Sequence, residues 1–474
     1  MGLWTRKSIR ELQESSEEGN HKLKRHLTSF DLILLGIGCV IGAGLFSITG
    51  IAAAENAGPA IVIAFLIAAV GCAFAGLCYS ELAAMIPIAG SAYTYAFATL
   101  GEFIAWIIGW NLILEYAIGA AAVSISWSAY MVSLLKDFNI ELPAAFVASP
   151  WQPISHVAGV YEYGFINLPA LLIIAVISVI LIVGIKQSAV FNAAMVLTKV
   201  SVVILFIALG AFYINYDNYK PFLPPNTGEF GHFGWSGVMR AAGVVFFAYI
   251  GFDAVSTAAQ EAKTPQKSMP IGILGSLVIC TILYVLFSLV MTGLVNYKDL
   301  NVAAPAALAI ENTPFHWLQG LVKLAILAGL TSVMLVLLLG QSRVFYAMAK
   351  DGLLPSMFAN IHPTYHTPWI SNLILLVFSG LIGAFAPLSV VGHMTSIGTL
   401  FAFAIVCAGV LVLRYTEPKL YRPFKTPWVP FVPIMGILVC LLMMLSLGIE
   451  TWLRLIVWLV IGVLVYFYYG RFHR

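Results

Sequence analysis

Long apolar runs recur along nearly the whole chain, and short polar segments separate them. Each run is long enough for a helix to cross a hydrocarbon layer of ~30 Å. The longest connection between runs, 136–166, is too short to hold a separate soluble domain. We therefore predict an all-α integral membrane protein with about twelve transmembrane helices, near residues 31–55, 59–86, 103–134, 167–185, 189–213, 236–261, 270–295, 318–348, 369–386, 389–413, 431–449 and 452–470.

Two of these runs are interrupted in mid-span, each in the first helix of one half of the chain. The first run contains GIGCVIGAG, with glycines at 36, 38, 42 and 44, and the sixth contains FFAYIGFD, which ends in the acid Asp253. Backbone leaves a transmembrane helix only where it lines a cavity and its polar groups find partners. Matched broken helices are a known way of building a substrate site at the bilayer midplane, so the pattern predicts a small-molecule carrier.

The polarity of the broken ends indicates what they could bind. A helix that restarts near Gly42 presents free N–H groups and the positive end of its dipole, which favour a carboxylate. The first half of the sixth span ends near Phe247 and Ala248, where free carbonyls can accept hydrogen bonds from an ammonium group. Together these groups predict an α-amino acid. The spacing of Gly38 and Gly42 would also suit close helix packing, and that alternative stays open for the first span alone.

Charged residues inside spans are the next candidates, because burying one costs roughly 2.5–3.5 kcal/mol. Lys199 lies near the centre of the fifth span, ~15 Å from its cytoplasmic end. Its amine could occupy the place of a cation and exchange protons during transport; a permanent ion pair is the structural alternative. Glu115, in the third span, is predicted as a charge partner or proton relay. Thr331 and Ser332, in the eighth span, could bind the amine, a cation or their own helix backbone.

Composition and charge set the orientation and exclude other classes. The 474 residues are 61% hydrophobic and only 9% charged. If both termini are cytoplasmic, seventeen lysines and arginines lie inside against five outside, which predicts that topology. The polar segment 1–30 is then a cytoplasmic N-terminal segment, and 31–470 is a single transmembrane domain. The six cysteines lie within spans, and no HExxH, GxSxG or GxxxxGK[ST] occurs, so we expect no cofactor, metal site or enzymatic activity.

Several motifs together resemble the amino acid–polyamine–organocation (APC) superfamily, and within it the cationic amino acid transporters and their bacterial relatives. The resemblance runs from about residue 22 to the C-terminus. The motifs are GIGCVIGAGLF, CYSELAAMIPIAGSAYTY, GWNLILEY, FFAYIGFDAVSTAAQEAKTPQKSMP, RVFYAMAKDGLLP and SIGTLFAFAIVCAGVLVLRY. Their order along the chain adds to their specificity.

The resemblance implies a five-plus-five inverted repeat, about 31–213 and 236–413, with two extra helices over about 431–470. It implies carboxylate contacts at Ala43 and Gly44, and amine contacts from the backbone of Val40, Phe247, Ala248 and Ile250. It also associates Lys199 with proton coupling, and Glu81, Arg343 and Asp351 with an inner gate. Two positions depart from the pattern: Ala43 replaces a common threonine or serine, and Gln260 replaces the first of two glutamates.

The expected function is secondary active uptake of amino acids by alternating access, coupled to protons, across the plasma membrane (the inner membrane of a bacterium). Small neutral side chains are slightly preferred, because Ile250 and the stretches 334–339 and 400–403 are apolar. Transport or exchange of cationic amino acids or polyamines is the alternative within the class. A channel or a non-transporting nutrient receptor is the alternative from another class. The expected partners are amino acid, protons and membrane lipid, without nucleic acid; a small membrane-protein partner and the oligomeric state are left open.

Overall fold

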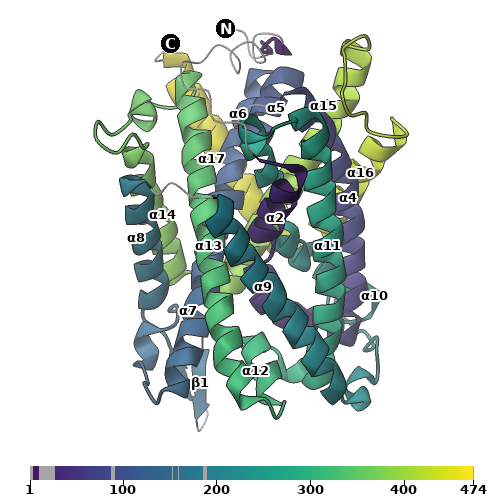
Figure 1. Ribbon diagram of the computed structural model, residues 1–474, viewed down its shortest axis with the longest axis vertical. Coiled ribbons are helices and arrows are strands. Elements are labelled where there is room, and N and C mark those ends of the chain that lie inside the picture. Colours follow the sequence, from purple (N-terminus) through teal and green to yellow (C-terminus); the bar gives the residue numbers. More distant parts are fainter. Residues whose placement is uncertain are drawn as a thin grey trace.

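The computed structural model describes residues 4–9, 27–86, 91–151, 153–157, 160–184 and 189–472. Long helices run side by side and form a bundle (Figure 1). In the described part of the chain, eight helices are long and apolar enough to cross a membrane, and four shorter helices are also apolar. The main helices are α2 (Ser29–Val40), α4 (Ile61–Met85), α6 (Glu102–Ile113), α7 (Gly119–Asp137), α8 (Leu168–Val183), α9 (Ala189–Gly210), α10 (Gly234–Val245), α11 (Pro265–Leu294), α13 (His316–Lys350), α14 (Trp369–Phe385), α15 (Leu388–Thr416), α16 (Phe431–Ser446) and α17 (Ile449–Phe472).

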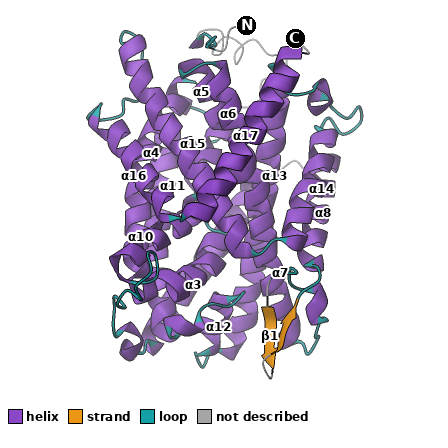
Figure 2. Ribbon diagram, turned by 180° about the vertical axis from the view of Figure 1, so that it is seen from behind, coloured by secondary structure: helices purple, strands orange, loops and turns teal. Residues whose placement is uncertain are grey.

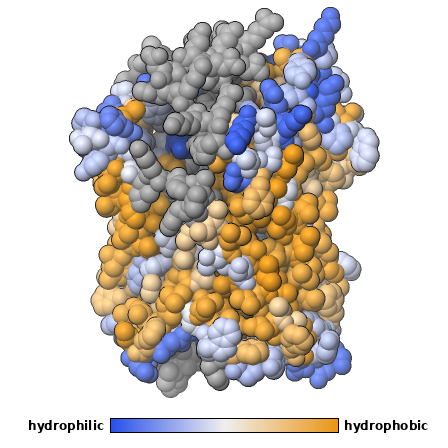
Figure 3. All heavy atoms as spheres, viewed as in Figure 1, coloured by the Kyte–Doolittle hydropathy of each residue, from blue (hydrophilic) through white to orange (hydrophobic). Residues whose placement is uncertain are grey.

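These helices confirm the prediction of an all-helical membrane bundle, and each predicted span overlaps helical structure. The count of twelve stays a prediction, since four of the helices have only 10–17 residues. A band of apolar residues covers the middle of the face seen in Figure 3, and hydrophilic residues lie toward both ends. That distribution fits a protein whose middle is surrounded by lipid.

The first span is divided as the glycine pattern predicts. Thr28 begins α2 with a capping box, in which its N–H donates to the Asp31 carboxylate at 2.8 Å. The helix ends at Val40, and Ile41 is extended, with ψ of 102°. Helical structure then resumes in the π-helical turn Gly44–Ile48, followed by α3 (Thr49–Ala52) and a second π turn, Ala53–Ala57.

The sixth span breaks at the matching position. After α10, the chain forms a 3₁₀ turn, Phe246–Tyr249, and then Ile250 becomes extended, with ψ of 134°. Gly251 has φ of +110°, and a Cβ there would lie 3.0 Å from the Cys39 carbonyl oxygen, so this position needs glycine. A second 3₁₀ segment, Asp253–Glu261, completes the span.

The bundle has two distinct ends. We call the end where residues 4–9 and the close of α17 lie the terminal end; it also carries α5 (Ser91–Thr99) (Figure 1). The opposite, or hairpin, end carries α12 (Pro305–Glu311) and the antiparallel strands β1 (Pro153–Val157) and β2 (Val160–Tyr163) (Figure 2). The apolar pattern did not predict α12 or the hairpin, because both are short elements in the connections between spans.

The remaining elements are short helical turns in the connections. One π turn, Leu114–Ile118, joins α6 to α7 within the long third span, so Glu115 sits in irregular helix. The others are 3₁₀ turns at Gly58–Ala60, Ala144–Phe146, Ala211–Tyr213, Tyr216–Tyr219, Tyr297–Asp299 and Ser356–Ala359.

Candidate functional site

A small cavity of about 20 Å³ lies between the two broken helices. Six of the seven residues predicted to bind substrate line it: Val40, Gly42, Ala43, Gly44, Phe247 and Ile250. The seventh, Ala248, packs directly behind Gly44, where an added Cβ would collide with the Ala248 backbone. The structure therefore brings the predicted residues together, and the glycine at 44 is what allows the two breaks to touch.

The other walls of the cavity are apolar. Cys39 belongs to the first break, Gly119 and Val123 come from α7, and Val333 and Leu337 come from α13. No charged side chain is among the residues that line this cavity. A ligand here would meet backbone polar groups on one side and aliphatic side chains on the other.

Donors for an anion lie at the restart of the first span. The N–H groups of Leu45 and Phe46 both donate to the Gly42 carbonyl at 3.2 Å, which closes the first turn of the new helix. In such a first turn, the N–H groups of the leading residues have no acceptor within the helix. Those of Ala43 and Gly44 are therefore suited to a carboxylate, as the sequence predicts.

Acceptors for a cation lie on the opposite side, and a tyrosine joins them. The Tyr284 hydroxyl, on α11, lies 2.8 Å from the Val40 carbonyl oxygen and 2.8 Å from that of Ala248. A hydroxyl donates only one hydrogen, so one of these two carbonyls keeps unused acceptor capacity. Our reading of the sequence missed Tyr284, since a tyrosine within an apolar run carries no distinctive pattern.

Lys199 is buried beside the first break, with 2% of its surface exposed. Its Nζ donates to the Gly38 carbonyl at 2.8 Å, near the end of α2. Its aliphatic stem packs on Gly329 of α13, where an added Cβ would lie 3.0 Å from the lysine Cε. The lysine thus connects α9 to α2 and α13.

The two predicted hydroxyl partners of Lys199 have other partners. Thr331 accepts a hydrogen bond from Trp127 Nε1 at 3.0 Å and donates to the Leu327 carbonyl. Ser332 donates to the Gly329 carbonyl at 3.2 Å. Both hydroxyls therefore bond to their own helix backbone, as serine and threonine in helices often do.

Glu115 is fully buried and interacts electrostatically with Asp253 rather than with Lys199. Its carboxyl group lies near the side chains of Asp253 and Thr399. One Asp253 oxygen accepts from Tyr116 at 2.5 Å and from Ser91 at 3.0 Å. The two acids therefore lie close together inside the bundle, at the level of the irregular third and sixth spans.

A group of polar contacts lies at the terminal end of the bundle, beyond Glu115 and Asp253. Asp351, just after α13, accepts from Lys7 Nζ at 2.5 Å and from the Tyr93 hydroxyl at 2.6 Å. The Lys7 ammonium also lies 4.8 Å from the centre of the Phe97 ring. These contacts fasten the N-terminal residues across the ends of α13 and α5.

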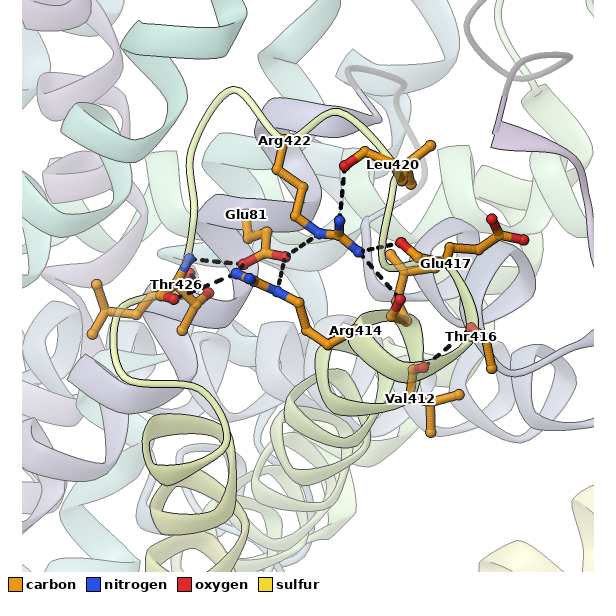
Figure 4. Close-up of polar contacts among 10 residues, drawn as sticks. Glu81, Val412, Arg414, Thr416, Glu417, Leu420, Arg422 and Thr426 are labelled. Carbon is orange, nitrogen blue, oxygen red and sulfur yellow. Dashed lines mark hydrogen bonds and ion pairs between the residues drawn. The ribbon is translucent and has the colours of Figure 1, made fainter.

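Two of the three residues predicted to form an inner gate, Glu81 and Asp351, have different partners. Glu81, at the end of α4, pairs instead with Arg414 and Arg422 (Figure 4). Arg343 lies on α13, about two turns before Asp351. Asp351 takes part in the contacts with Lys7 and Tyr93 at the terminal end.

The hairpin end is closed by a different layer. The Tyr130 hydroxyl donates to the Phe46 carbonyl at 2.5 Å and accepts from the Ala306 N–H of α12 at 3.3 Å. The hydroxyls of Ser47 and Ser126 are also hydrogen-bonded across the first span and α7. A separate hollow of about 650 Å³ lies at this end, with walls from α7 and α12.

Comparisons with known proteins agree with this geometry. The profile of a family described as amino acid permease matches residues 27–466. The methylthioribose transporter of Bacillus subtilis is 44% identical over 97% of this chain and 96% of its own length. The branched-chain amino acid permease BcaP of the same organism is 44% identical over 99% and 98%. The vacuolar cationic amino acid transporter 4 of Arabidopsis thaliana is 36% identical over 88% and 68%.

Proposed function

The chain belongs to the amino acid permease family, a group of membrane transporters and not enzymes, and we propose that it takes up neutral amino acids together with protons. The observation that carries this proposal is the cavity between the broken helices. Its backbone donors suit a carboxylate, its free carbonyl suits an ammonium group, and its walls suit an aliphatic side chain.

The apolar walls favour small or medium neutral side chains over cationic ones. A lysine or arginine side chain would need an acid or several carbonyls to replace its water. The nearest candidates, Glu115 and Asp253, do not line the cavity, and Asp253 already accepts two hydrogen bonds. The relatives named as branched-chain permeases support the same direction, and the cationic transporters are less similar.

Proton coupling through Lys199 is the second part of the proposal. The protonated amine bonds to the Gly38 carbonyl and so ties α9 to the broken first helix. A neutral amine binds that carbonyl more weakly, because charge-assisted hydrogen bonds are stronger than neutral ones. Loss of the proton would then loosen the first helix and permit alternating access. Glu115 is the other candidate proton carrier.

We also propose twelve spans arranged as five plus five inverted repeats and two added helices, with the terminal end in the cytoplasm. Matching breaks in α2 and α10, the first helices of the two halves, support the repeat. The excess of basic residues predicted inside supports the orientation. The plasma membrane, or the inner membrane of a bacterium, is the location consistent with that topology.

Methylthioribose is a second candidate substrate, because a transporter named for it is as similar to this chain as BcaP is. A thiosugar lacks both the carboxylate and the ammonium group that the broken helices suit. It would therefore leave the free N–H groups of the first break without an anion.

Competition in reconstituted vesicles separates these substrates. We expect labelled alanine uptake to rise with an inward proton gradient, and unlabelled alanine and leucine to inhibit it. Lysine, arginine and methylthioribose should inhibit far less. Stronger inhibition by arginine than by alanine would indicate a transporter of cationic amino acids. Uptake of methylthioribose but not of alanine would indicate that the substrate is the thiosugar and not an amino acid.

A further inference from the structure

The segment that joins α15 to α16 is held in a fixed shape by one buried acid. Glu81 accepts two hydrogen bonds from Arg414, at 3.1 and 2.7 Å, and one from Arg422 at 3.0 Å (Figure 4). It also accepts from the Thr426 N–H at 2.7 Å. We call residues 414–431 the connector. Because Glu81 belongs to α4, these bonds fasten the connector to a transmembrane helix.

Arg422 also holds the connector through hydrogen bonds to nearby backbone carbonyl groups. It donates to the carbonyl oxygens of Leu413, Glu417 and Leu420 at 2.8–3.1 Å. With its bond to Glu81, four of the five N–H groups of the guanidinium have partners. A connector ordered in this way presents its remaining side chains in one preformed arrangement.

Those remaining side chains are aromatic and basic. Four rings are exposed: Tyr415 by 73%, Tyr421 by 81%, Trp428 by 79% and Phe431 by 55%. Lys419 and Lys425 are exposed between them, and neither has an ion-pair partner among the described residues. The connector and Glu81 together contain four basic side chains and two acidic ones, so their summed charge is positive.

The connector lies where the lipid-facing surface of α16 begins. From Phe431 onward, α16 exposes an apolar stripe at Ile434, Leu438, Leu441, Leu442 and Leu445. The connector, drawn in yellow-green, projects from the side of the bundle at its terminal end (Figure 1). Aromatic rings concentrate at the level of the lipid headgroups, and basic side chains near that level attract anionic lipids.

We propose that the connector is a docking surface for the headgroups of anionic phospholipids. The rings would lie in the interfacial layer, and Lys419 and Lys425 would bind the headgroup phosphates. Charge complementarity and continuity with the apolar stripe of α16 favour a lipid over an acidic protein. Because Glu81 ties the connector to α4, and α15 leads into it, bound lipid stabilises the terminal ends of both helices.

Thermal unfolding of the purified full chain in detergent tests this proposal. Phosphatidylglycerol should raise the midpoint of unfolding more than phosphatidylcholine does. One lysine near an anionic surface strengthens binding about fivefold. The variant Lys419→Gln/Lys425→Gln should therefore need about 30-fold more phosphatidylglycerol for the same shift. The two lysines are exposed and unpaired within the described residues, so the variant should fold normally.

A matched pair at the same end provides the control. Lys263→Gln/Lys267→Gln removes two exposed lysines near the start of α11, outside the connector. This variant should keep the response to phosphatidylglycerol. An unchanged response in the connector variant would overturn the proposal. An equal loss of the response to phosphatidylglycerol in both variants would overturn it too. That result would show that basic residues anywhere at the terminal end attract the lipid.

Discussion

Among single residues, Lys199 makes the contact with the most direct consequence for coupling, since its amine bonds to the Gly38 carbonyl beside the first break. We expect Lys199→Ala to lose pH-driven accumulation while still binding substrate, because the exchangeable proton is removed. Lys199→Arg should fail as well, since a guanidinium does not release its proton in proteins. Uptake with and without a proton gradient measures this loss.

The neighbouring Thr198 provides the control for Lys199. Its exposed hydroxyl bonds to the Ala194 carbonyl of its own helix, and no other partner is found among the described residues, so Thr198→Ala should accumulate substrate normally. Full accumulation by Lys199→Ala would place the coupling group elsewhere, with Glu115 the next residue to change.

The close approach of the two breaks at Gly44 gives a second test. A Cβ in Gly44→Ala would collide with the Ala248 backbone, which cannot move as a side chain can. Overpacking of this kind costs roughly 1–3 kcal/mol, so we expect a lower melting temperature and a strong loss of uptake. Gly320→Ala on α13 meets nothing within 4 Å and should behave like the parent chain. Normal uptake by Gly44→Ala would show that the breaks separate easily.

For single residues, the sequence could predict how deep in the bundle a side chain lies but not which groups it contacts. Glycines and a lysine are conspicuous in apolar runs, so the broken segments and Lys199 were identified correctly as buried in mid-bundle. Depth along a helix does not determine which face a side chain occupies. Thr331 and Ser332 bond to their own helix backbone, one of the alternatives that the sequence left open for them. Their proposed roles, and that of Glu115, stay predictions.

Among elements, α4 and the connector depend on Glu81, which is fully buried between two arginines. Glu81→Gln should destabilise the chain by about 3–5 kcal/mol, because it leaves a buried guanidinium without its counter-charge. Thermal unfolding in detergent checks this. Glu450→Gln is the control, since its pair with Arg454 is an exposed i,i+4 pair worth roughly 0.3–0.5 kcal/mol. A loss no larger than that of Glu450→Gln would contradict the role of the cluster.

The elements themselves were predictable to different degrees. Apolar length is sufficient to locate long helices. Closely spaced glycines locate the break after α2, and a glycine near an acid locates the break after α10. The π turn at Leu114–Ile118 could not be foreseen, because it depends on packing against other helices. The strands of the hairpin and α12 have only four to seven residues, too short to stand out in a search for spans. The arginine partners of Glu81 lie 333 and 341 residues further along the chain, and hydropathy does not relate residues so far apart.

For the whole molecule, the two ends of the bundle provide a test of orientation. Tyr421 is exposed at the terminal end, and Glu141 is exposed at the hairpin end. The native cysteines are all buried, so they should give little background. In intact cells, an impermeant thiol reagent should label Glu141→Cys but not Tyr421→Cys. Labelling of both from outside would contradict a cytoplasmic terminal end.

The cavity between the breaks has a consequence for the transport cycle. A volume of about 20 Å³ holds a single water molecule and no amino acid. An amino acid therefore fits only if the walls of the cavity move apart. Since the backbone of the two breaks forms one wall, the side chains of α7 and α13 that form the other wall must give way to make room for the substrate side chain.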